Sequence, residues 1–237
     1  CFGITIDLVK YTKLNRFLTE SVLSRYLPQP VVDQIVDGDL SFTESPRAYV
    51  ATVLFSDLKG FTAMSNKLPA AKVGKLLNQY FEVMTEVVFD HEGTLDKFIG
   101  DAMMVLFGAP VEMSPNEQAR RAARCALAMQ AAVPRLNEIW EAEGLQPPAC
   151  RIGIHQGPVV VGNFGSQRRS DYTAIGTTVN LAARLESVCE AGEALVSVDI
   201  ANFLPEEAFT RAGEFELKGF GEPVPAFRLI EGDGSGQ

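Results

Sequence analysis

Two aspartates in the first half of the chain, Asp57 and Asp101, stand where side chains can do chemistry. Asp57 follows the apolar run 50–56, and Asp101 follows the β-rich run 97–99 and a glycine. Residues beside turns at strand ends are where rigid scaffolds expose functional groups. Two carboxylates delivered from neighbouring strand ends suit a hard divalent cation, which prefers oxygen ligands and keeps positions for substrate phosphates. Each acid also has an ordinary alternative, a helix cap for Asp57 and a hairpin-turn residue for Asp101.

Lys97 is a third residue that points to chemistry. It lies between Leu95 and the apolar pair Phe98 and Ile99, inside a predicted strand. A lone cation is costly to bury in such a place unless it pairs with an acid or binds a ligand. We therefore expect Lys97 to have a specific partner.

The composition bounds the class of protein. The chain has 237 residues, of which 46% are hydrophobic and 22% charged, so we expect one globular domain with extensions. The net charge of −9 disfavours a general nucleic-acid or anionic-membrane binder. The four cysteines show no C-x-x-C spacing and are predicted to be free thiols, buried where they fall in apolar patterns, in a reducing compartment. No apolar run approaches the roughly 18 residues of a membrane span.

Hydrophobic periodicity predicts an α+β fold with a mostly antiparallel sheet and helices packed on one face. Pro134 should bend or split the second long helix, and Gln156-Gly157-Pro158 should turn the chain after the fourth strand. The predicted strands are 49–56, 94–99, 102–107, 151–155, 159–162, 172–176, 194–198, 213–218 and 224–230, and the helices are 69–91, 116–143 and 177–190.

The chain divides into three predicted parts. Residues 1–45 form an N-terminal helical linker or coupling segment, with apolar residues at helical spacing over 14–26 and a short helix over 31–36. Residues 46–231 form the main domain, and 232–237 form a flexible tail. Because the chain starts at Cys1 rather than Met, we expect a piece of a longer protein.

Other catalytic signatures do not fit. The glycine-rich stretch 162–166 has no following Gly-Lys-Ser/Thr, so it is not a P-loop, and no G-x-S-x-G elbow is present. His155 is predicted to be a core or turn histidine rather than a catalytic base.

Four stretches in register carry a family resemblance. They are Phe55-Ser56-Asp57-Leu58-Lys59-Gly60-Phe61-Thr62, Lys97-Phe98-Ile99-Gly100-Asp101, Arg151-Ile152-Gly153-Ile154-His155-Gln156-Gly157, and Asp171-Tyr172-Thr173-Ala174-Ile175-Gly176-Thr177-Thr178-Val179-Asn180-Leu181-Ala182-Ala183-Arg184-Leu185-Glu186. In order and spacing, over roughly 49–230, they resemble the catalytic domain of class III adenylyl and guanylyl cyclases, most closely the bacterial-type homodimeric adenylate cyclases. The resemblance implies a ferredoxin-like or palm-type sheet.

The resemblance also implies roles for the site residues. Asp57, Asp101 and the backbone carbonyl of Leu58 would hold two divalent cations, Mg²⁺ or Mn²⁺. One cation would lower the pKa of the ribose 3′-hydroxyl and the other would hold the triphosphate. The remaining implied contacts are Arg184 with the α-phosphate, Asn180 with the ribose, and Arg151 and Lys218 with the phosphates.

Base selection would rest on Lys97 and Thr173. Thr173 stands where mammalian-type adenylyl cyclases carry Asp, and its hydroxyl can accept a hydrogen bond from the adenine amino group. Guanylyl cyclases carry Glu where Lys97 stands. The pair therefore favours ATP, although a hydroxyl fixes the base less firmly than a carboxylate.

The implied partners are ATP and a second copy of the chain, with no nucleic acid. In the family, metal acids of one subunit face base, Asn and Arg residues of the other, and this chain carries both sets. Residues 157–171 would be a dimer arm, or alternatively a solvated hairpin. An upstream sensory or membrane module is expected, with the catalytic domain in the cytoplasm and tethered to the membrane if that module spans it.

Three other functions stay open. They are a non-catalytic cyclase-like regulatory domain that binds nucleotide, a guanylate cyclase, and a diguanylate cyclase. The last would require a Gly-Gly-Asp/Glu-Glu-Phe hairpin, whereas this hairpin reads Ile-Gly-Asp-Ala-Met.

Overall fold

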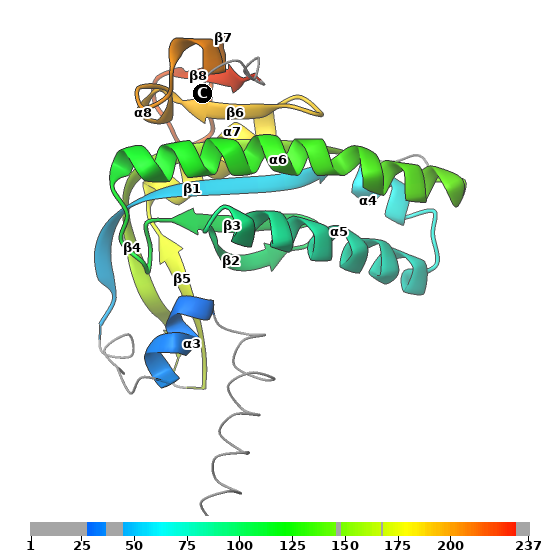
Figure 1. The fold of residues 1–237 in the computed structure, drawn as a ribbon, viewed down its shortest axis with the longest axis horizontal. Helices are drawn as coiled ribbons and strands as arrows, with labels where there is room; N and C mark the ends of the chain where they lie inside the picture. The colour runs from blue at the N-terminus through cyan, green and yellow to red at the C-terminus, as the bar shows by residue number, and fades with distance from the viewer. Residues whose placement is uncertain (1–27, 37–44, 146–147, 167, 231–237) are drawn as a thin grey trace, which may run out of the picture.

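The computed structural model describes residues 28–36, 45–145, 148–166 and 168–230 (Figure 1). The predicted helical pattern over 14–26 and the tail 232–237 lie outside these residues. Of the N-terminal segment, helix α3 (Gln29–Val36) is described, and it begins two residues before the predicted helix 31–36. None of the described helices is both long and apolar enough to cross a lipid bilayer.

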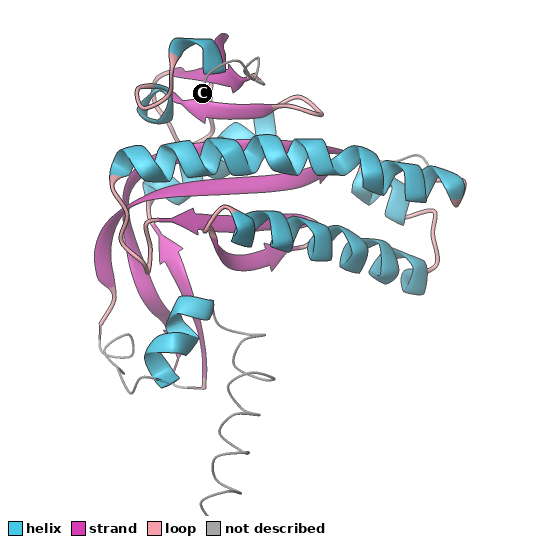
Figure 2. Cartoon of the chain, viewed as in Figure 1, coloured by secondary structure: helices cyan, strands magenta, loops and turns pink. Residues whose placement is uncertain are grey.

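Within the described residues, eight strands form one sheet in the order β2-β3-β1-β4-β6-β8-β7, and β5 pairs with β4 (Figure 2). All strand pairs are antiparallel except β4–β6, which is parallel. This confirms the predicted α+β class with a mostly antiparallel sheet. The strands are β1 (Arg47–Lys59), β2 (Thr94–Ile99), β3 (Ala102–Phe107), β4 (Ala149–Ser166), β5 (Arg169–Ile175), β6 (Ala194–Ser197), β7 (Phe209–Phe215) and β8 (Val224–Leu229).

Helices cover both faces of the sheet, so the prediction that all helices share one face is wrong. On β1, Leu54 packs in the cluster that contains α5 and α6, whereas Val53 and Phe55 pack with Ala182 of α7. Neighbouring strand residues point to opposite faces, and β1 is apolar on both, so each face needs a cover. The described helices are α3, α4 (Phe61–Ser65), α5 (Ala70–Asp90), α6 (Pro115–Ala142), α7 (Thr177–Val188), α8 (Val198–Ala201) and the 3₁₀ turn η3 (Glu206–Ala208).

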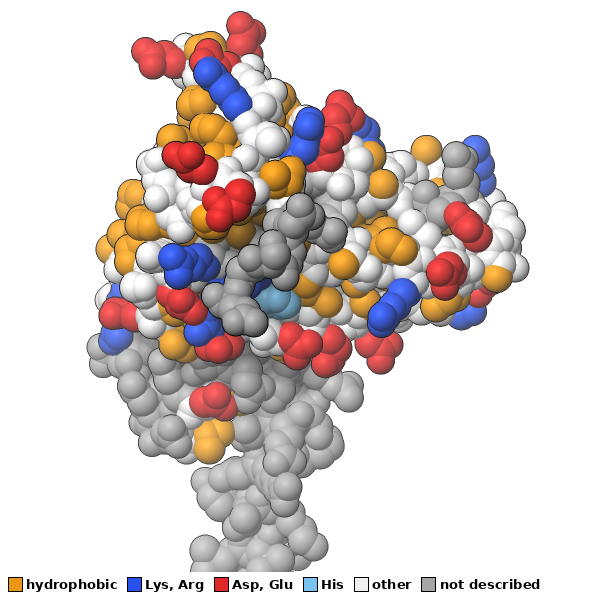
Figure 3. Space-filling model, turned by 45° about the horizontal axis from the view of Figure 1, so that its top comes forward, with side chains coloured by type: hydrophobic (Ala, Val, Ile, Leu, Met, Phe, Trp, Pro, Cys, Tyr) orange, Lys and Arg blue, Asp and Glu red, His pale blue; other side chains and the backbone are white. Residues whose placement is uncertain are grey.

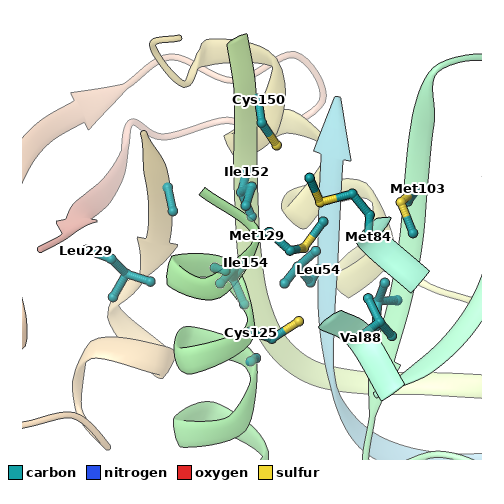
Figure 4. Close-up of a cluster of buried hydrophobic side chains, with 14 of the residues drawn as sticks. Leu54, Met84, Val88, Met103, Cys125, Met129, Cys150, Ile152, Ile154 and Leu229 are labelled. Atoms are coloured by element: carbon teal, nitrogen blue, oxygen red, sulfur yellow. The ribbon is translucent and has the colours of Figure 1, made fainter. Parts of the chain in front are cut away.

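The larger core lies between the sheet and the helices α5 and α6. Figure 4 shows side chains of both helices meeting those of β1, β3 and β4 in this cluster. Cys125 and Cys150 belong to it, and with Cys189 they are free and buried, as predicted for these three. On the outside, acidic and basic side chains are interspersed over the described part of the surface drawn in Figure 3.

The predicted turn after the fourth strand is wrong, and so is one alternative predicted for Pro134. The sequence predicts a turn at Gln156-Gly157-Pro158, but β4 runs unbroken through it because β1 pairs with it throughout. On the other edge of β4, pairing with β6 ends at Ile154 and pairing with β5 starts at Val160. Pro158 lies between these two paired stretches. Proline is tolerated there because that edge has no strand partner. Of the two alternatives predicted for Pro134, a split of the helix is wrong, because α6 runs from Pro115 to Ala142 with an exposed Pro134 inside it.

A buried polar network joins the start of α6 to the sheet. Gln118 donates to the carbonyls of Val50 (3.0 Å) and Met113 (2.9 Å), and Gln156 donates to Thr52 Oγ1 (2.8 Å). Buried amides are stable only when they are hydrogen-bonded, so these contacts fix the position of α6 over β1 and β4.

Gly153 lets helix α7 lie directly on β4. A Cβ at this residue would lie 2.1 Å from the backbone nitrogen of Glu186 and 2.4 Å from the carbonyl oxygen of Ala182. Both contacts are with backbone, which cannot move aside as a flexible side chain would. The position of α7, and of every predicted site residue on it, therefore depends on the absence of a side chain at Gly153.

We predict that Gly153→Ala destabilises the fold by about 1–3 kcal/mol or more, because the methyl group must push α7 off the strand. The measurement is chemical denaturation followed by circular dichroism. Gly74→Ala is the matched control, since Gly74 lies in α5 with nothing within 4 Å of an added Cβ. Removing a helical glycine should stabilise by roughly 0.5–1 kcal/mol. Equal stability of Gly153→Ala and wild type would show that α7 does not need this close approach.

Candidate active site

Asp57 and Asp101 come together at one end of the central strands. The β1–β3 ladder ends at the pair Ser56 and Met103, so Asp57 follows the last pair and Asp101 lies in the β2–β3 turn. Gly100 has φ of 67°, the left-handed geometry that lets the chain reverse there. Burial and the Asp57 charge raise the pKa of Asp101 above its usual value. Asp101 is thus both a turn residue and a close neighbour of a second carboxylate.

Arg151 lies opposite Asp57 in the β1–β4 ladder and holds it. Its Nε and Nη2 donate to Asp57 Oδ2 at 3.0 and 2.6 Å, and Nη1 donates to the carbonyl of Ser187 at 2.9 Å. The predicted phosphate-binding arginine therefore rests against a predicted metal ligand and the end of α7.

Glu186 of α7 completes this cluster. Its Oε1 lies 2.7 Å from Arg151 Nε, but this N–H points at Asp57, so Oε1 has charge attraction without an aligned hydrogen bond. Burial raises the pKa of Glu186 to about 7, and the nearby Asp57 and Asp101 add to the rise while Arg151 opposes it. Two acids, Asp57 and Glu186, thus share the Arg151 guanidinium.

A second group of side chains gathers where β2 contacts β5. Thr173 Oγ1 donates to Asp96 Oδ2 at 2.7 Å, and Lys97 Nζ lies 3.7 Å from the same oxygen. Lys97 therefore has the partner that its apolar surroundings require, and it shares that partner with Thr173. The Lys97 side chain is 33% exposed to solvent.

The other predicted residues stand apart from the two groups. Asn180 and Arg184 are exposed on α7, four residues apart and so on one side of the helix, and Lys218 is exposed in the β7–β8 loop. Within the described residues these three side chains make no hydrogen bond or ion pair. Their roles stay predictions.

Sequence reasoning missed Asp96 and Glu186. Both lie next to predicted site residues, Asp96 before Lys97 and Glu186 two positions after Arg184. Two adjacent charges inside a buried strand are a usable signal for Asp96, because a regular strand would send them to opposite faces. For Glu186 the sequence offers helical spacing alone, which does not show that it faces Arg151.

The oxygen donors of Asp57 and Asp101 fit a hard divalent cation that takes its remaining ligands from water and a bound substrate. Two half-buried carboxylates repel each other at the strand end, beside the carbonyl of Leu58, and a cation would relieve that repulsion. Among the described residues no three His, Cys, Asp or Glu side chains form a closed metal site. A cation here would need water and substrate oxygens as well, which suits Mg²⁺ or Mn²⁺ better than a structural metal.

We predict that Asp101→Asn melts at the same or a higher temperature than wild type without metal. A carboxyl whose folded pKa is raised stabilises the fold only at low pH and loses this effect as pH rises through that pKa, so at pH 7.5 its charge destabilises. Mn²⁺ should raise the melting temperature of wild type but not of Asp101→Asn, as followed by differential scanning fluorimetry.

Asp90→Asn, a change at an exposed acid on α5, is the matched control and should keep the Mn²⁺ effect. An undiminished Mn²⁺ shift in Asp101→Asn would remove this carboxylate from the candidate metal site.

The sequence is similar to a protein-family model and to known proteins. The family model described as the adenylate and guanylate cyclase catalytic domain matches residues 43–230. Adenylate cyclase 1 of Rhizobium meliloti (strain 1021) is 35% identical over 163 residues, which is 69% of this chain and 24% of that protein. The adenylate cyclase of Anabaena cylindrica is 31% identical over 186 residues, which is 76% of this chain and 35% of that protein. The chain thus spans roughly a quarter to a third of these relatives.

Solved structures are similar over most of the described domain. The adenylyl cyclase CyaB from P. aeruginosa is 38% identical, with a TM-score of 0.76 over 79% of this chain and 96% of that chain. The guanylyl cyclase Cya2 is also 38% identical, with a TM-score of 0.72 over 78% of this chain and 93% of that chain. Overall similarity therefore does not separate the two nucleotides.

Proposed function

Because the chain belongs to the adenylate and guanylate cyclase catalytic domain family, we propose that it is an adenylate cyclase that converts ATP to 3′,5′-cyclic AMP and pyrophosphate. The observation that carries the choice of ATP is the group formed by Lys97, Thr173 and Asp96. An ammonium only donates hydrogen bonds, which suits the adenine ring nitrogen and not the N–H of guanine at that position.

In the proposed reaction the ribose 3′-oxygen attacks the α-phosphorus. A new 3′-O–P bond forms, the bond from the α-phosphorus to the bridging oxygen breaks, pyrophosphate leaves, and the hydroxyl proton goes to water. Divalent cations bound at Asp57 and Asp101 would acidify the hydroxyl and offset the charge of the triphosphate. This transfer depends on positioning and charge stabilisation more than on covalent chemistry.

The residues of the chain would do the positioning. Arg151 would turn part of its guanidinium from Asp57 to the triphosphate, while the Ser187 carbonyl holds Nη1 and Glu186 stays close to Nε. Arg184 would bind the α-phosphate, where a guanidinium fork matches the developing charge, and Asn180 would orient the ribose. Lys218 would contact the phosphates from the β7–β8 loop.

We propose that each active site is shared between two copies of the chain. Asn180 and Arg184 face outward from α7, and Phe98 and Ile99 of β2 and Ile175 of β5 are exposed apolar residues beside the base-reading group. A symmetric dimer would cover such residues and bring the acids of one copy to the α7 face of the other. It would form two equivalent sites.

A guanylate cyclase is the second candidate, since Cya2 is as similar as CyaB. Lys97 argues against it, because guanine presents a donor where the ammonium also donates. A non-catalytic nucleotide-binding domain is disfavoured because the chain keeps Asp57, Asp101, Lys97, Asn180 and Arg184.

The direct test is incubation of the protein with ATP or GTP and Mn²⁺, followed by chromatography for the cyclic product and pyrophosphate. We expect cyclic AMP to form at least tenfold faster than cyclic GMP. Absence of both products from a folded dimer would favour the regulatory domain, and a faster rate with GTP would favour the guanylate cyclase.

We also predict complementation between two inactive variants. Asp57→Ala removes a metal ligand and Arg184→Ala removes the α-phosphate contact, so each homodimer should lose about a hundredfold or more in kcat. In a co-refolded mixture, half the dimers carry one intact composite site, so activity should return to about a quarter of wild type. Mixed dimers purified through two different affinity tags that stay inactive would contradict the shared site.

A further inference from the structure

Asp96 is a buried acid that takes no part in the bond-forming and bond-breaking steps of the proposed reaction. Its side chain is 1% exposed, its Oδ2 accepts from Thr173 Oγ1 at 2.7 Å, and Lys97 Nζ lies 3.7 Å from that oxygen. Its other oxygen, Oδ1, has no hydrogen-bond partner among the described residues. Burying a carboxylate that is only partly satisfied is costly, so its position needs a reason.

A β-bulge puts Asp96 in this place. On β2, Leu95 pairs with Val105 and Lys97 pairs with Met104, so Asp96 is an extra residue without a partner on β3. Successive residues of a regular strand point to opposite faces, whereas a bulge re-aims a side chain. The bulge thus lets the consecutive residues Asp96 and Lys97 both reach the neighbourhood of Thr173 on β5.

The contact with Asp96 decides what the Thr173 hydroxyl can offer a ligand. A hydroxyl has one proton, and an ionised carboxylate can only accept a hydrogen bond. The other acceptor near Thr173 Oγ1 is the Ala174 carbonyl at 3.5 Å, well beyond the usual O–H···O distance, so the proton points at Asp96. Toward a ligand, Thr173 Oγ1 then presents lone pairs only.

The charge state of Asp96 supports this assignment of Thr173 as the donor and Asp96 as the acceptor. Burial raises the pKa of Asp96 to about 6, although the Thr173 hydrogen bond and the Lys97 charge act to lower it. Near pH 8 the carboxyl is therefore ionised and cannot donate to Thr173.

We propose that Asp96 is a positioning residue that fixes Thr173 as an acceptor and Lys97 as a donor toward the purine, and so selects ATP over GTP. This inference rests on the proposed function, which supplies the purine nucleotide that binds at the site. Adenine presents an amino donor and a ring-nitrogen acceptor, which match an acceptor and a donor. Guanine presents a carbonyl acceptor and an N–H donor, so both of its groups would meet a group of the same kind. Asp96 acts through its two neighbours and need not touch the base.

The test is the binding of α,β-methylene ATP and α,β-methylene GTP, which cannot release pyrophosphate, measured by calorimetry at pH 8 with Mn²⁺. Wild type should bind the ATP analogue more tightly. Asp96→Asn keeps the shape but lets an amide donate to Thr173, which frees the hydroxyl proton to turn toward the base. We expect the ATP/GTP affinity ratio to fall about tenfold, the loss of one oriented hydrogen bond.

Two further variants make the role specific. Asp96→Ala should lower the ratio as well, which covers the case in which Asp96→Asn does not fold. In a Thr173→Val background, Asp96→Asn should change the ratio by less than about twofold, because the effect passes through the hydroxyl. Asp90→Asn, the exposed control on α5, should leave the ratio unchanged.

The ratio is measured on one preparation, so a general loss of folded protein cancels. An unchanged ratio in folded Asp96→Asn and Asp96→Ala would overturn the proposal, as would a wild type that binds the GTP analogue equally or more tightly. A wild type that does not cyclise ATP but whose ratio falls in these variants would refute the proposed catalysis while supporting this role of Asp96.

Discussion

The hydrogen-bonded ion pair between Asp57 and Arg151 is the interaction on which the candidate site depends. The β1–β4 ladder is unbroken from Arg47 and Val161 to Lys59 and Ala149, so its register sets these two residues opposite each other. A shift of one strand by one residue would put the side chains of Asp57 and Arg151 on opposite faces of the sheet. Both faces of β1 are apolar, but such a shift would exchange Leu54 with Val53 and Phe55 between two closely packed clusters, and close packing opposes that exchange. Packing of the core therefore fixes the register of β1 and β4, and the register fixes the positions of Asp57 and Arg151.

Helix α7 links this ion pair to the residues that face outward. Its close approach to β4 at Gly153 brings Glu186 to Arg151, and the same helix then carries Asn180 and Arg184 on its exposed side. One rigid element thus supports Arg151, the predicted phosphate-binding arginine, and in the proposed dimer it would present the predicted catalytic pair to a second chain. In a shared site, the geometry of both halves would depend on this one contact between helix and strand.

Periodicity and motif spacing predict most of this fold. The strands Thr94–Ile99 and Ala102–Phe107 have the predicted bounds, and the two acids lie together as expected. The errors arise where tertiary pairing overrides a local signal. The Gly157-Pro158 dipeptide is typical of a turn, yet pairing with β1 keeps it extended. Asp96 and Glu186 could not be assigned roles, because a bulge and the approach of α7 decide where they point.

The choice between adenine and guanine shows what kind of information the sequence lacks. Two solved relatives with the same identity to this chain are named for different reactions, one as an adenylyl cyclase and the other as a guanylyl cyclase. The choice of nucleotide therefore depends on a few side chains rather than on the fold. A threonine in a motif is ambiguous, because its hydroxyl both donates and accepts. The ambiguity ends only when its neighbour is known, and here that neighbour is a carboxylate brought by a bulge in another strand. An aspartate in place of Thr173 would be an acceptor by itself but would repel Asp96. In the proposed site, Asp96 together with a hydroxyl at position 173 would therefore replace a single carboxylate at position 173. The two arrangements would offer the purine the same lone pairs with one negative charge.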